Sequence, residues 1–332
     1  MAQEAEAITK KRKPGNDFVG DGSGDGDGAE GDLPTLPEAP SLGDDPKSLA
    51  EAPGSYPDLV DVHIACLSDG RYGDSKHRFG YKNPCVGDKE PLSFLAAEIQ
   101  SGNHILQEKI KLLNDKYAAL RRIRDDGDCF YRSFMFSYME QIVATQDKAE
   151  VDRILANVAR CRKTLQVLGD PDFMVDEFFS VFISLLENVL EESRPSLSHE
   201  ELLQISRDES FSDNLVLFFR IVTSGEIRRR AAFFEPFIIG LENTSVDQFC
   251  KESVEMMGEE SNHVQIIALS DALGVPISVE YLDQNSSDGG AVTPSDVVPN
   301  ESNPSGTYLS STPWVNLLCH LGHYEILYPK CQ

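Results

Sequence analysis

The stretch Arg124-Asp125-Asp126-Gly127-Asp128-Cys129-Phe130-Tyr131-Arg132-Ser133-Phe134 joins a polar, glycine-containing turn to the start of an amphipathic helix. We expect that helix over about 130–145, which places Cys129 at its first turn. Unpaired backbone N–H groups and the helix dipole favour the thiolate there, and the thiolate is the nucleophile. Amides of Cys129 and the preceding residues are candidates for holding an oxyanion. The stretch predicts a cysteine nucleophile, although a cysteine at a helix start can also simply be packed.

A base for this nucleophile is available near the other end of the chain. His323 falls on the last predicted strand, and Glu325 must point to the same face because strand side chains alternate. A carboxylate beside the imidazole accepts a hydrogen bond from one ring nitrogen and leaves the other free to take the thiol proton. Cys129, His323 and Glu325 are therefore a candidate nucleophile, base and acid.

A metal cluster of Cys319, His320, His323 and Cys331 is the competing interpretation of this region. Cys319 and His320 are adjacent and tend to face opposite ways on a strand, so tetrahedral zinc would require a distorted backbone. Cys161, on an apolar helix face, and Cys250, after Phe249, are predicted to lie in the core, because free cysteine packs as a small hydrophobe.

Working outward, helical periodicity dominates the chain before Gly274, and strand patterns follow it. We expect helices over the following ranges, the fifth opened by a capping box of Ser198 and Glu201: 106–120, 130–145, 147–168, 173–191, from 198, 211–222, 227–234 and 263–273. We expect strands over 275–281, 315–319 and 323–328, with a polar loop over 284–313. This order predicts one α+β domain, with helices first and then a small, largely antiparallel sheet.

The first quarter of the chain has a different composition. Residues 1–57 are mostly Gly, Pro, Asp, Glu, Ala and Ser without periodicity, which predicts a disordered acidic tail. Within it, the basic run 10–13 is compatible with nuclear import but also with a solvated tail, and 21–32 only imitates a calcium-binding loop because helical flanks are missing. Residues 58–85 are transitional, and the folded domain is expected over 86–331.

The charge balance and the cysteines indicate which classes of function and which cellular compartment fit this chain. The 55 acidic residues exceed the 30 basic ones by 25, which argues against a general binder of nucleic acid or membrane surfaces. No apolar run is long enough to cross a bilayer. The seven cysteines form no CxxC pair and no signal peptide is recognisable, so we expect reduced thiols in the cytoplasm, or also in the nucleus.

Two motifs at the two ends of the domain resemble the otubain branch of the ovarian-tumour (OTU) cysteine proteases. They are Asp126-Gly127-Asp128-Cys129-Phe130-Tyr131-Arg132-Ser133-Phe134 and Gly322-His323-Tyr324-Glu325-Ile326-Leu327-Tyr328. Similar stretches at 86–92 and 229–237 extend the likeness over about 86–330. The resemblance implies a papain-like OTU fold and a deubiquitinase that cleaves the isopeptide bond at the C-terminus of ubiquitin, without a metal or organic cofactor. It also implies a leaning toward the compact chain type that directs proteins to the proteasome.

The resemblance further implies a role for each site residue. Cys129 would attack the carbonyl, His323 would act as base and then acid, Asp126 would shape the loop before the nucleophile, and Glu325 would stand at the acid position. The segment 58–85 would be an arm that helps hold ubiquitin. Two departures matter: Asp128 replaces the usual Asn, and Glu325 replaces the usual Asp. An extra carboxylate beside a thiolate should raise its pKa, so slow turnover is expected.

Two other functions are open at this point. The first is a regulator that binds ubiquitin and ubiquitin-conjugating enzymes, with cleavage weak or absent, as the resemblance and the two departures allow. The second is a cysteine esterase or amidase acting on small molecules, which the same triad permits; the open polar loop 284–313 suits a protein substrate better.

Overall fold

The computed structural model describes residues 83–98, 104–190, 196–282, 293–297, 299 and 313–330. The expected tail over 1–57, with its basic run and calcium-loop imitation, lies outside the described residues, as do Cys331 and all but the last three residues of the expected arm over 58–85. The two domain boundaries set there stay predictions.

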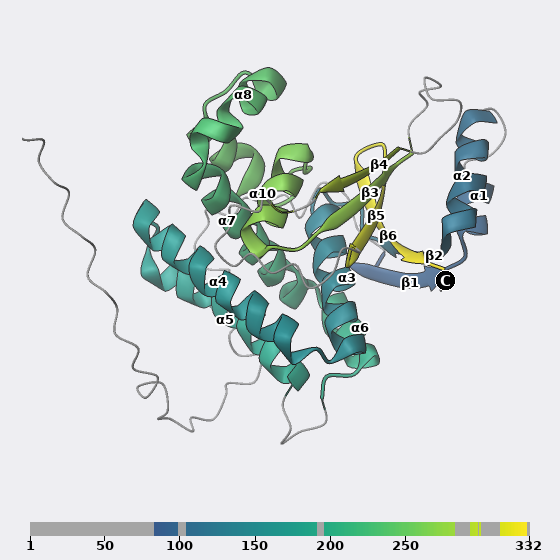
Figure 1. Cartoon of the computed structure of the whole chain (residues 1–332), viewed down its shortest axis with the longest axis horizontal. Helices are drawn as coiled ribbons and strands as arrows, with labels where there is room; N and C mark the ends of the chain where they lie inside the picture. Colours follow the sequence, from purple (N-terminus) through teal and green to yellow (C-terminus); the bar gives the residue numbers. More distant parts are fainter. Residues whose placement is uncertain are drawn as a thin grey trace, which may run out of the picture. The chain divides into compact units, whose positions relative to one another are not determined.

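Helices make up most of the described chain (Figure 1). The helices are α1 (Leu92–Glu98), α2 (His104–Lys116), α3 (Cys129–Thr145), α4 (Lys148–Leu168), α5 (Asp172–Leu190), α6 (His199–Arg207), α7 (Glu209–Arg229), α8 (Ala231–Glu242), α9 (Val246–Phe249), the π-helical turn η4 (Cys250–Val254) and α10 (His263–Leu273). The strands are β1 (Val86–Glu90), β2 (Tyr117–Ile123), β3 (Ile277–Tyr281), β4 (Thr293–Val297), β5 (Val315–His320) and β6 (His323–Pro329). No helix in the described part of the chain is long and apolar enough to cross a membrane.

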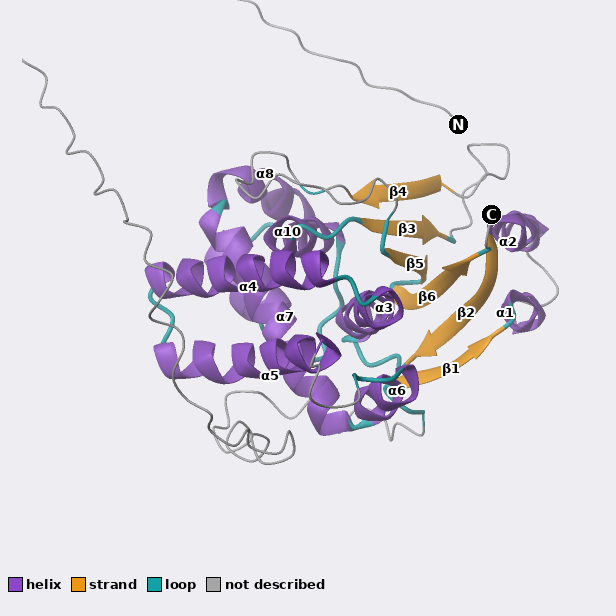
Figure 2. Cartoon of the chain, turned by 60° about the horizontal axis from the view of Figure 1, so that its bottom comes forward, coloured by secondary structure: helices purple, strands orange, loops and turns teal. Residues whose placement is uncertain are grey.

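The strands form one sheet in the order β1-β2-β6-β5-β3-β4, which Figure 2 shows from edge to edge. Only the β3–β5 pair is parallel, and the other neighbouring strands run antiparallel. The predicted fold class, α+β with a helix-rich part on a small, largely antiparallel sheet, is confirmed. The last two strands meet in a hairpin whose turn is Leu321–Gly322, close to the expected connection at 320–322.

Successive side chains of the central strands point to opposite faces of the sheet, and both faces are apolar. Leu317 and Ile326 join the large core beside α3, whereas their chain neighbours Leu318 and Leu327 join a smaller cluster with residues of α1 and α2. Figure 1 accordingly shows α3 on one side of the sheet and α1 and α2 on the other. Side chains of a strand that is covered on both faces must be apolar or paired, and β5 accordingly has three apolar residues in succession, Leu317 to Cys319.

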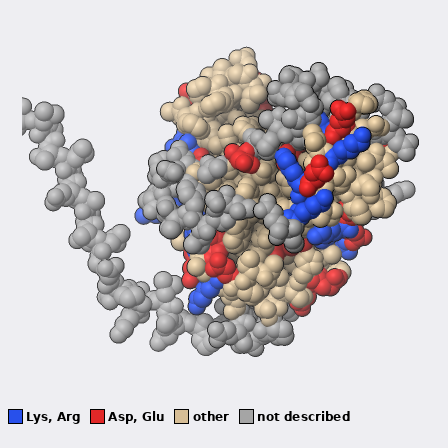
Figure 3. Space-filling model, turned by 45° about the vertical axis from the view of Figure 1, so that its right-hand side comes forward, with Lys and Arg blue, Asp and Glu red and all other residues tan. Residues whose placement is uncertain are grey.

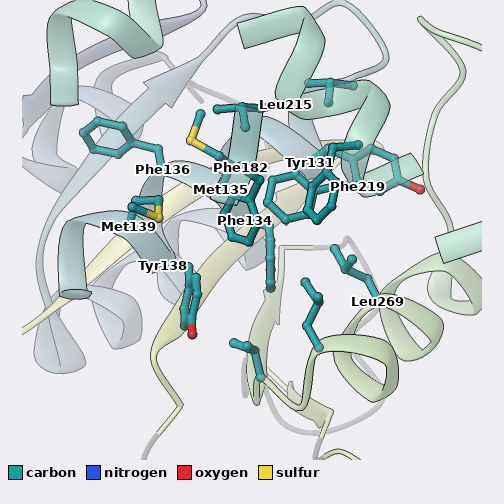
Figure 4. Packing of buried hydrophobic residues seen from close by; sticks show 14 of the residues in the cluster. Tyr131, Phe134, Met135, Phe136, Tyr138, Met139, Phe182, Leu215, Phe219 and Leu269 are labelled. Atoms are coloured by element: carbon teal, nitrogen blue, oxygen red, sulfur yellow. The ribbon is translucent and has the colours of Figure 1, made fainter. Parts of the chain in front are cut away.

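Helix α3 runs through the centre of the large core. Its aromatic side chains are fully buried, and Figure 4 shows Phe134 and Tyr131 beside Phe182 and Phe219 from other helices. The ring centroids of Phe134 and Phe219 lie 5.3 Å apart in an edge-to-face arrangement. Because α3 packs on β5 and β6 as well as on α7, its N-terminus is fixed relative to the last strand.

Several expectations about the elements along the chain are wrong, among them the polar loop over 284–313, which contains strand β4. The helix expected over 106–120 ends at Lys116, and Tyr117 and Leu120 lie in β2. Both side chains do enter one cluster with Leu106 and Leu113, so the shared apolar face was real while the backbone changes from helix to strand. The sheet also begins before the helices, since β1 and β2 precede α3. The expected helices at 211–222 and 227–234 are joined differently: α7 continues to Arg229 and α8 starts at Ala231.

Candidate active site

Cys129 is the first residue of α3, as the sequence predicts, and the turn before it is held by close backbone packing. Gly127 has a φ of +78°, and a Cβ there would lie 1.9 Å from the carbonyl oxygen of Gly258. Only glycine fits such an approach. The turn before Cys129 is thus locked against the loop between η4 and α10.

Asp128 turns its carboxylate away from the helix and into a buried ion pair. Its Oδ1 accepts hydrogen bonds from Nε and Nη2 of Arg220 at 2.9 and 2.5 Å and from the Gly258 amide at 3.1 Å. Arg220, on α7, is fully buried and also donates to the carbonyls of Val254, Gly127 and Glu259. Asp128 therefore binds three segments of chain together, a role that no local sequence pattern indicates.

Asp126 lies in the same turn and is bonded on both oxygens. Its Oδ1 accepts from the Asp128 amide at 3.1 Å, and its Oδ2 accepts from Nη2 of Arg132 at 2.7 Å. Arg132, one turn into α3, also contacts Asp213 and Ser212 at the start of α7. The Asp128 amide is therefore engaged within the turn. The amide of Cys129 has no intrahelical acceptor, because it lies in the first turn of the helix.

The Cys129 thiol is 3% exposed and meets the last strand. The backbone amide of Tyr324 points to its Sγ at 3.4 Å, and Ser133 of α3 donates to the Tyr324 carbonyl at 3.1 Å. Burial raises the pKa of Cys129 to about 12, the Tyr324 amide opposes this, and the negative charges of Asp126, Asp125 and Asp128 add to it. The expectation that the helix start favours a thiolate is not met in the free protein, because burial outweighs it.

His323 immediately precedes Tyr324 on β6, so its backbone lies one residue from the amide that contacts Cys129. Its Nε2 lies 3.9 Å from Oε1 of Glu325, on the same strand face as expected, and its Nδ1 lies 3.6 Å from Oδ1 of Asp125. Neither distance is a hydrogen bond. Nδ1 is buried and has no hydrogen-bond partner among the described residues. Asp125, whose side chain is 82% exposed, is a neighbour of the imidazole that the sequence analysis did not single out.

Glu325 is buried on β6 and is held by a neighbouring strand. Its Oε1 accepts from Nη1 of Arg122 on β2 at 3.0 Å, closer than the imidazole. Burial raises the pKa of Glu325, whereas Arg122 and then His323 lower it. The expected carboxylate–imidazole hydrogen bond is therefore replaced by a carboxylate that faces the imidazole while bonded to an arginine.

The other cysteines and histidines do not assemble into a metal site in the part of the chain that is described. Cys161 and Cys250 are buried among apolar side chains, which confirms their predicted core placement. Burial raises the pKa of both thiols to about 12, as it does for Cys129, so the pKa alone does not separate these two thiols from the candidate nucleophile.

Comparisons with known proteins show the family of this chain. The family model Peptidase C65 Otubain matches residues 80–329. An Arabidopsis thaliana protein named OVARIAN TUMOR DOMAIN-containing deubiquitinating enzyme 1 is 58% identical over 251 residues, which cover 75% of this chain and 82% of the relative. Human ubiquitin thioesterase OTUB1 is 39% identical over 247 residues, covering 74% and 84%.

Solved structures give the same result for the fold. A complex described as h/ceOTUB1-ubiquitin aldehyde-UBCH5B~Ub superposes with a TM-score of 0.65 at 28% identity, covering 75% of this chain and 91% of that one. A second complex, of ceOTUB1 with ubiquitin aldehyde and UBC13~Ub, gives a TM-score of 0.65 and covers 75% and 94%. The resemblance in the sequence is confirmed, and the chain belongs to the otubain family of cysteine peptidases and is a cysteine-type hydrolase.

Proposed function

We propose that this otubain is a deubiquitinase that hydrolyses the isopeptide bond between the C-terminus of ubiquitin and a lysine, with Cys129 as nucleophile. The observation that carries the proposal is the meeting of α3 and β6. The Tyr324 amide contacts Cys129 Sγ, and the adjacent His323 has a buried Nδ1 that finds no hydrogen-bond partner among the residues the structure describes. That nitrogen is available to take a proton. The names of the relatives, deubiquitinating enzyme and ubiquitin thioesterase, support the substrate class.

In the proposed reaction, the Cys129 thiol gives its proton to His323 as Sγ bonds to the scissile carbonyl carbon. The Cys129 amide donates to the resulting oxyanion. Collapse of the intermediate breaks the C–N bond, the imidazolium protonates the leaving lysine amine, and an acyl-enzyme remains. Water, deprotonated by His323, then attacks the thioester and releases ubiquitin and the thiol. Glu325 stabilises the imidazolium, and Asp126 shapes the turn that presents the nucleophile.

The high pKa of the buried thiol has a consequence for this scheme. At neutral pH Cys129 is protonated in the free protein, so the thiolate must form together with attack or after substrate binding changes its surroundings. We therefore propose slow turnover, with burial of the Cys129 thiol as its main cause, whereas the sequence pointed to the Asp128 carboxylate. Asp128 contributes to the shift, but its carboxylate is paired with Arg220, and burial is the larger cause.

The test is a panel of di-ubiquitins of each linkage with the full-length chain and its Cys129→Ala variant. We expect cleavage by the wild type, strongest for the chain type that directs proteins to the proteasome, and none by the variant. An electrophile at the ubiquitin C-terminus should label the wild type alone. A Cys129→Ala variant that still cleaves would remove Cys129 as nucleophile, whereas equal rates on all linkages would remove only the linkage proposal.

We also propose that ubiquitin and charged ubiquitin-conjugating enzymes are partners. Solved OTUB1 complexes that resemble this chain contain ubiquitin aldehyde and conjugates of UBCH5B or UBC13. A purely regulatory role with weak or no cleavage is the less favoured function, because the nucleophile, the base and the carboxylate are all present near one another. The Cys129→Ala variant separates the two, since binding should survive and cleavage should not.

Helix α8 offers a surface for a protein substrate. Phe233 and Phe237, one turn apart, are 45% and 53% exposed, and Leu241 a further turn along is 59% exposed. Such an apolar stripe on a surface helix marks an interaction site more often than a solvated face. We assign it to ubiquitin, because ubiquitin is present in the related complexes. Phe237→Asp should raise KM for di-ubiquitin and leave kcat unchanged; an unchanged KM would contradict the assignment.

For location we propose the cytoplasm and, through the basic run 10–13, also the nucleus. Fluorescent fusions of the full chain and of a variant with these basic residues replaced by alanine provide the test. Nuclear signal that is equal in both would contradict the role of the basic run.

A further inference from the structure

Arg122 is a side chain of β2 that no motif of the sequence singles out, and it lies at the centre of a group of carboxylates. Its Nη1 donates to Glu325 at 3.0 Å, its Nη2 donates to Glu98 of α1 at 2.8 Å, and its Nε is hydrogen-bonded to Glu90 of β1. Every nitrogen of the guanidinium thus contacts a carboxylate, and these carboxylates come from three different elements.

The register of the sheet fixes this arrangement. Strands β2 and β6 are antiparallel and pair Arg121 with Ile326, so Arg122 lies beside Glu325. The two side chains share the face of the sheet that α1 and α2 cover, since Leu120 and Leu327 belong to that cluster. The Arg122 side chain is 28% exposed and that of Glu325 is 7% exposed, so the pair is screened from most solvent. A partly buried pair of this kind interacts more strongly than a surface pair.

We propose that Arg122 is a positioning residue for the reaction: it fixes the carboxylate of Glu325 opposite the His323 imidazole and keeps it ionised. The same oxygen of Glu325 that accepts from Arg122 lies 3.9 Å from His323 Nε2, so the guanidinium determines where that oxygen stands. Ionisation matters because a neutral carboxyl group stabilises an imidazolium poorly. The proposal rests on the proposed role of Glu325.

The charges around Glu325 make Arg122 necessary. Burial disfavours its ionised form, and Glu98 also opposes ionisation, whereas Arg122 and, more weakly, His323 favour it. The groups that face the carboxylate are therefore Arg122 from β2, His323 from β6 and Glu98 from α1, with Glu90 of β1 on the far side of the guanidinium. Among them Arg122 is the permanent cation, because histidine carries a charge only when protonated. Removing it leaves a buried carboxylate that takes up a proton instead.

A double-mutant cycle tests the proposal in the full-length chain, with a fluorogenic amide of the ubiquitin C-terminus as substrate. Arg122→Gln and Glu325→Gln should each lower kcat/KM about tenfold or more, and the double variant should be no slower than the slower single variant. Arg122→Lys, which keeps the charge, should recover most of the rate. Glu98→Gln, which removes an exposed partner of the same guanidinium, should change the rate less than about twofold.

The pH dependence of kcat/KM separates a loss of Glu325 ionisation from general damage to the fold. Because the Arg122→Gln variant loses activity through protonation of Glu325, its rate relative to the wild type should rise with pH as the carboxyl ionises. The Glu325→Gln deficit has no such recovery, since an amide does not titrate.

Three outcomes would overturn the proposal: losses that multiply in the double variant, an Arg122→Gln deficit that is independent of pH, or wild-type activity of Arg122→Gln beside an impaired Glu325→Gln. Activity that persists in Cys129→Ala would instead contradict the proposed function. Melting temperatures of all variants show whether a loss of rate reflects unfolding.

Discussion

Breaking the buried pair of Asp128 and Arg220 should destabilise this protein more than breaking the exposed pair of Arg207 and Asp88. Arg220 is fully buried, and the Asp128 side chain is 5% exposed. Replacing Arg220 by Gln removes the hydrogen-bonded cation of a buried carboxylate and leaves it with Arg132, whose Nη2 lies 3.7 Å from Asp128 Oδ2. Breaking a buried pair typically costs about 3–5 kcal/mol. Since about 1 kcal/mol shifts the melting temperature of a domain of this size by about 2–4 °C, the expected fall is about 6–20 °C.

Asp128→Asn should be milder, at about 1–2 kcal/mol. The asparagine oxygen can still accept from the guanidinium, and Arg220 retains the carbonyls of Val254, Gly127 and Glu259. The two side chains interact directly, so the double variant Asp128→Asn/Arg220→Gln should lose at least about 1 kcal/mol less than the sum of the single losses.

The assay is urea unfolding followed by circular dichroism, with the free energy of unfolding extrapolated to water. Arg207→Gln is the matched control, because Arg207 pairs with an exposed Asp88 carboxylate and should cost at most about 1 kcal/mol. Additive losses in the cycle, or an Arg220→Gln variant as stable as the control, would refute the claim that this pair holds the turn before Cys129.

Three further predictions concern the turns and the nucleophile. Gly127→Ala should lower the free energy of unfolding by at least about 2 kcal/mol, because the new Cβ would meet the backbone of Gly258. Gly169→Ala is the control: Gly169 also has a positive φ but has open space around it, so the loss should be about 1 kcal/mol. Equal losses in thermal unfolding would contradict the clash. Leu321→Asn should stabilise the β5–β6 turn by about 1 kcal/mol, since its φ of 52° followed by the positive φ of Gly322 suits Asn-Gly, and a lower melting temperature would argue against this. Alkylation of Cys129, followed by mass spectrometry, should accelerate about tenfold per pH unit between about pH 7 and 10, because its pKa is raised to about 12; a rate that levels off within this range would contradict the burial argument.

The parts of the fold that the sequence predicts well are those with a local cause. The capping box at Ser198 and Glu201 forms as expected, and the helix after Cys129 ends at Thr145. The strand at 323–328 is also observed, with His323 and Glu325 on one face. Each of these features depends on residues within one or two turns of one another, where periodicity and capping are informative.

The missed elements depend on distant partners. Strand β1 carries charged residues and exposes much of its length, so it becomes a strand only because β2 pairs with it. Strand β4 likewise depends on a partner: its sequence contains Pro294, it lies at the other edge of the sheet and it pairs with β3. The spacing of three between Tyr117 and Leu120 favours a helix, and the strand accommodates it through an irregularity between Tyr117 and Ala119, where β2 pairs with β6.

In the candidate site, too, residues marked by local sequence patterns are predictable and residues that depend on distant partners are not. Cys129 and His323 are recognisable because each sits at an element terminus or strand face that local patterns define. Arg122 and Arg220 are not, because their partners Glu325 and Asp128 lie 203 and 92 residues away in the chain. Arginine is common on helix and strand surfaces, so its presence alone does not indicate an ion pair with a site residue.

On the face that Figure 3 shows, basic and acidic side chains are interspersed rather than separated by sign, although the chain has a net charge of −25. The excess of acidic residues therefore does not prevent individual arginines from controlling the site. In this protein the local pairing of charges is more informative about mechanism than the net charge of −25.

Strand β6 contacts both Cys129 and Arg122, because its successive side chains point to opposite faces of the sheet. Tyr324 meets α3 and Cys129, whereas Glu325 meets Arg122 on the face covered by α1. A register shift of one residue between β2 and β6 would exchange these faces, burying a carboxylate against α3 and separating Glu325 from Arg122. The apolar residues Ile326 and Leu327 oppose such a shift, since each fits a different core cluster. The packing that sets the register of β6 therefore also sets the geometry between nucleophile, imidazole and carboxylate.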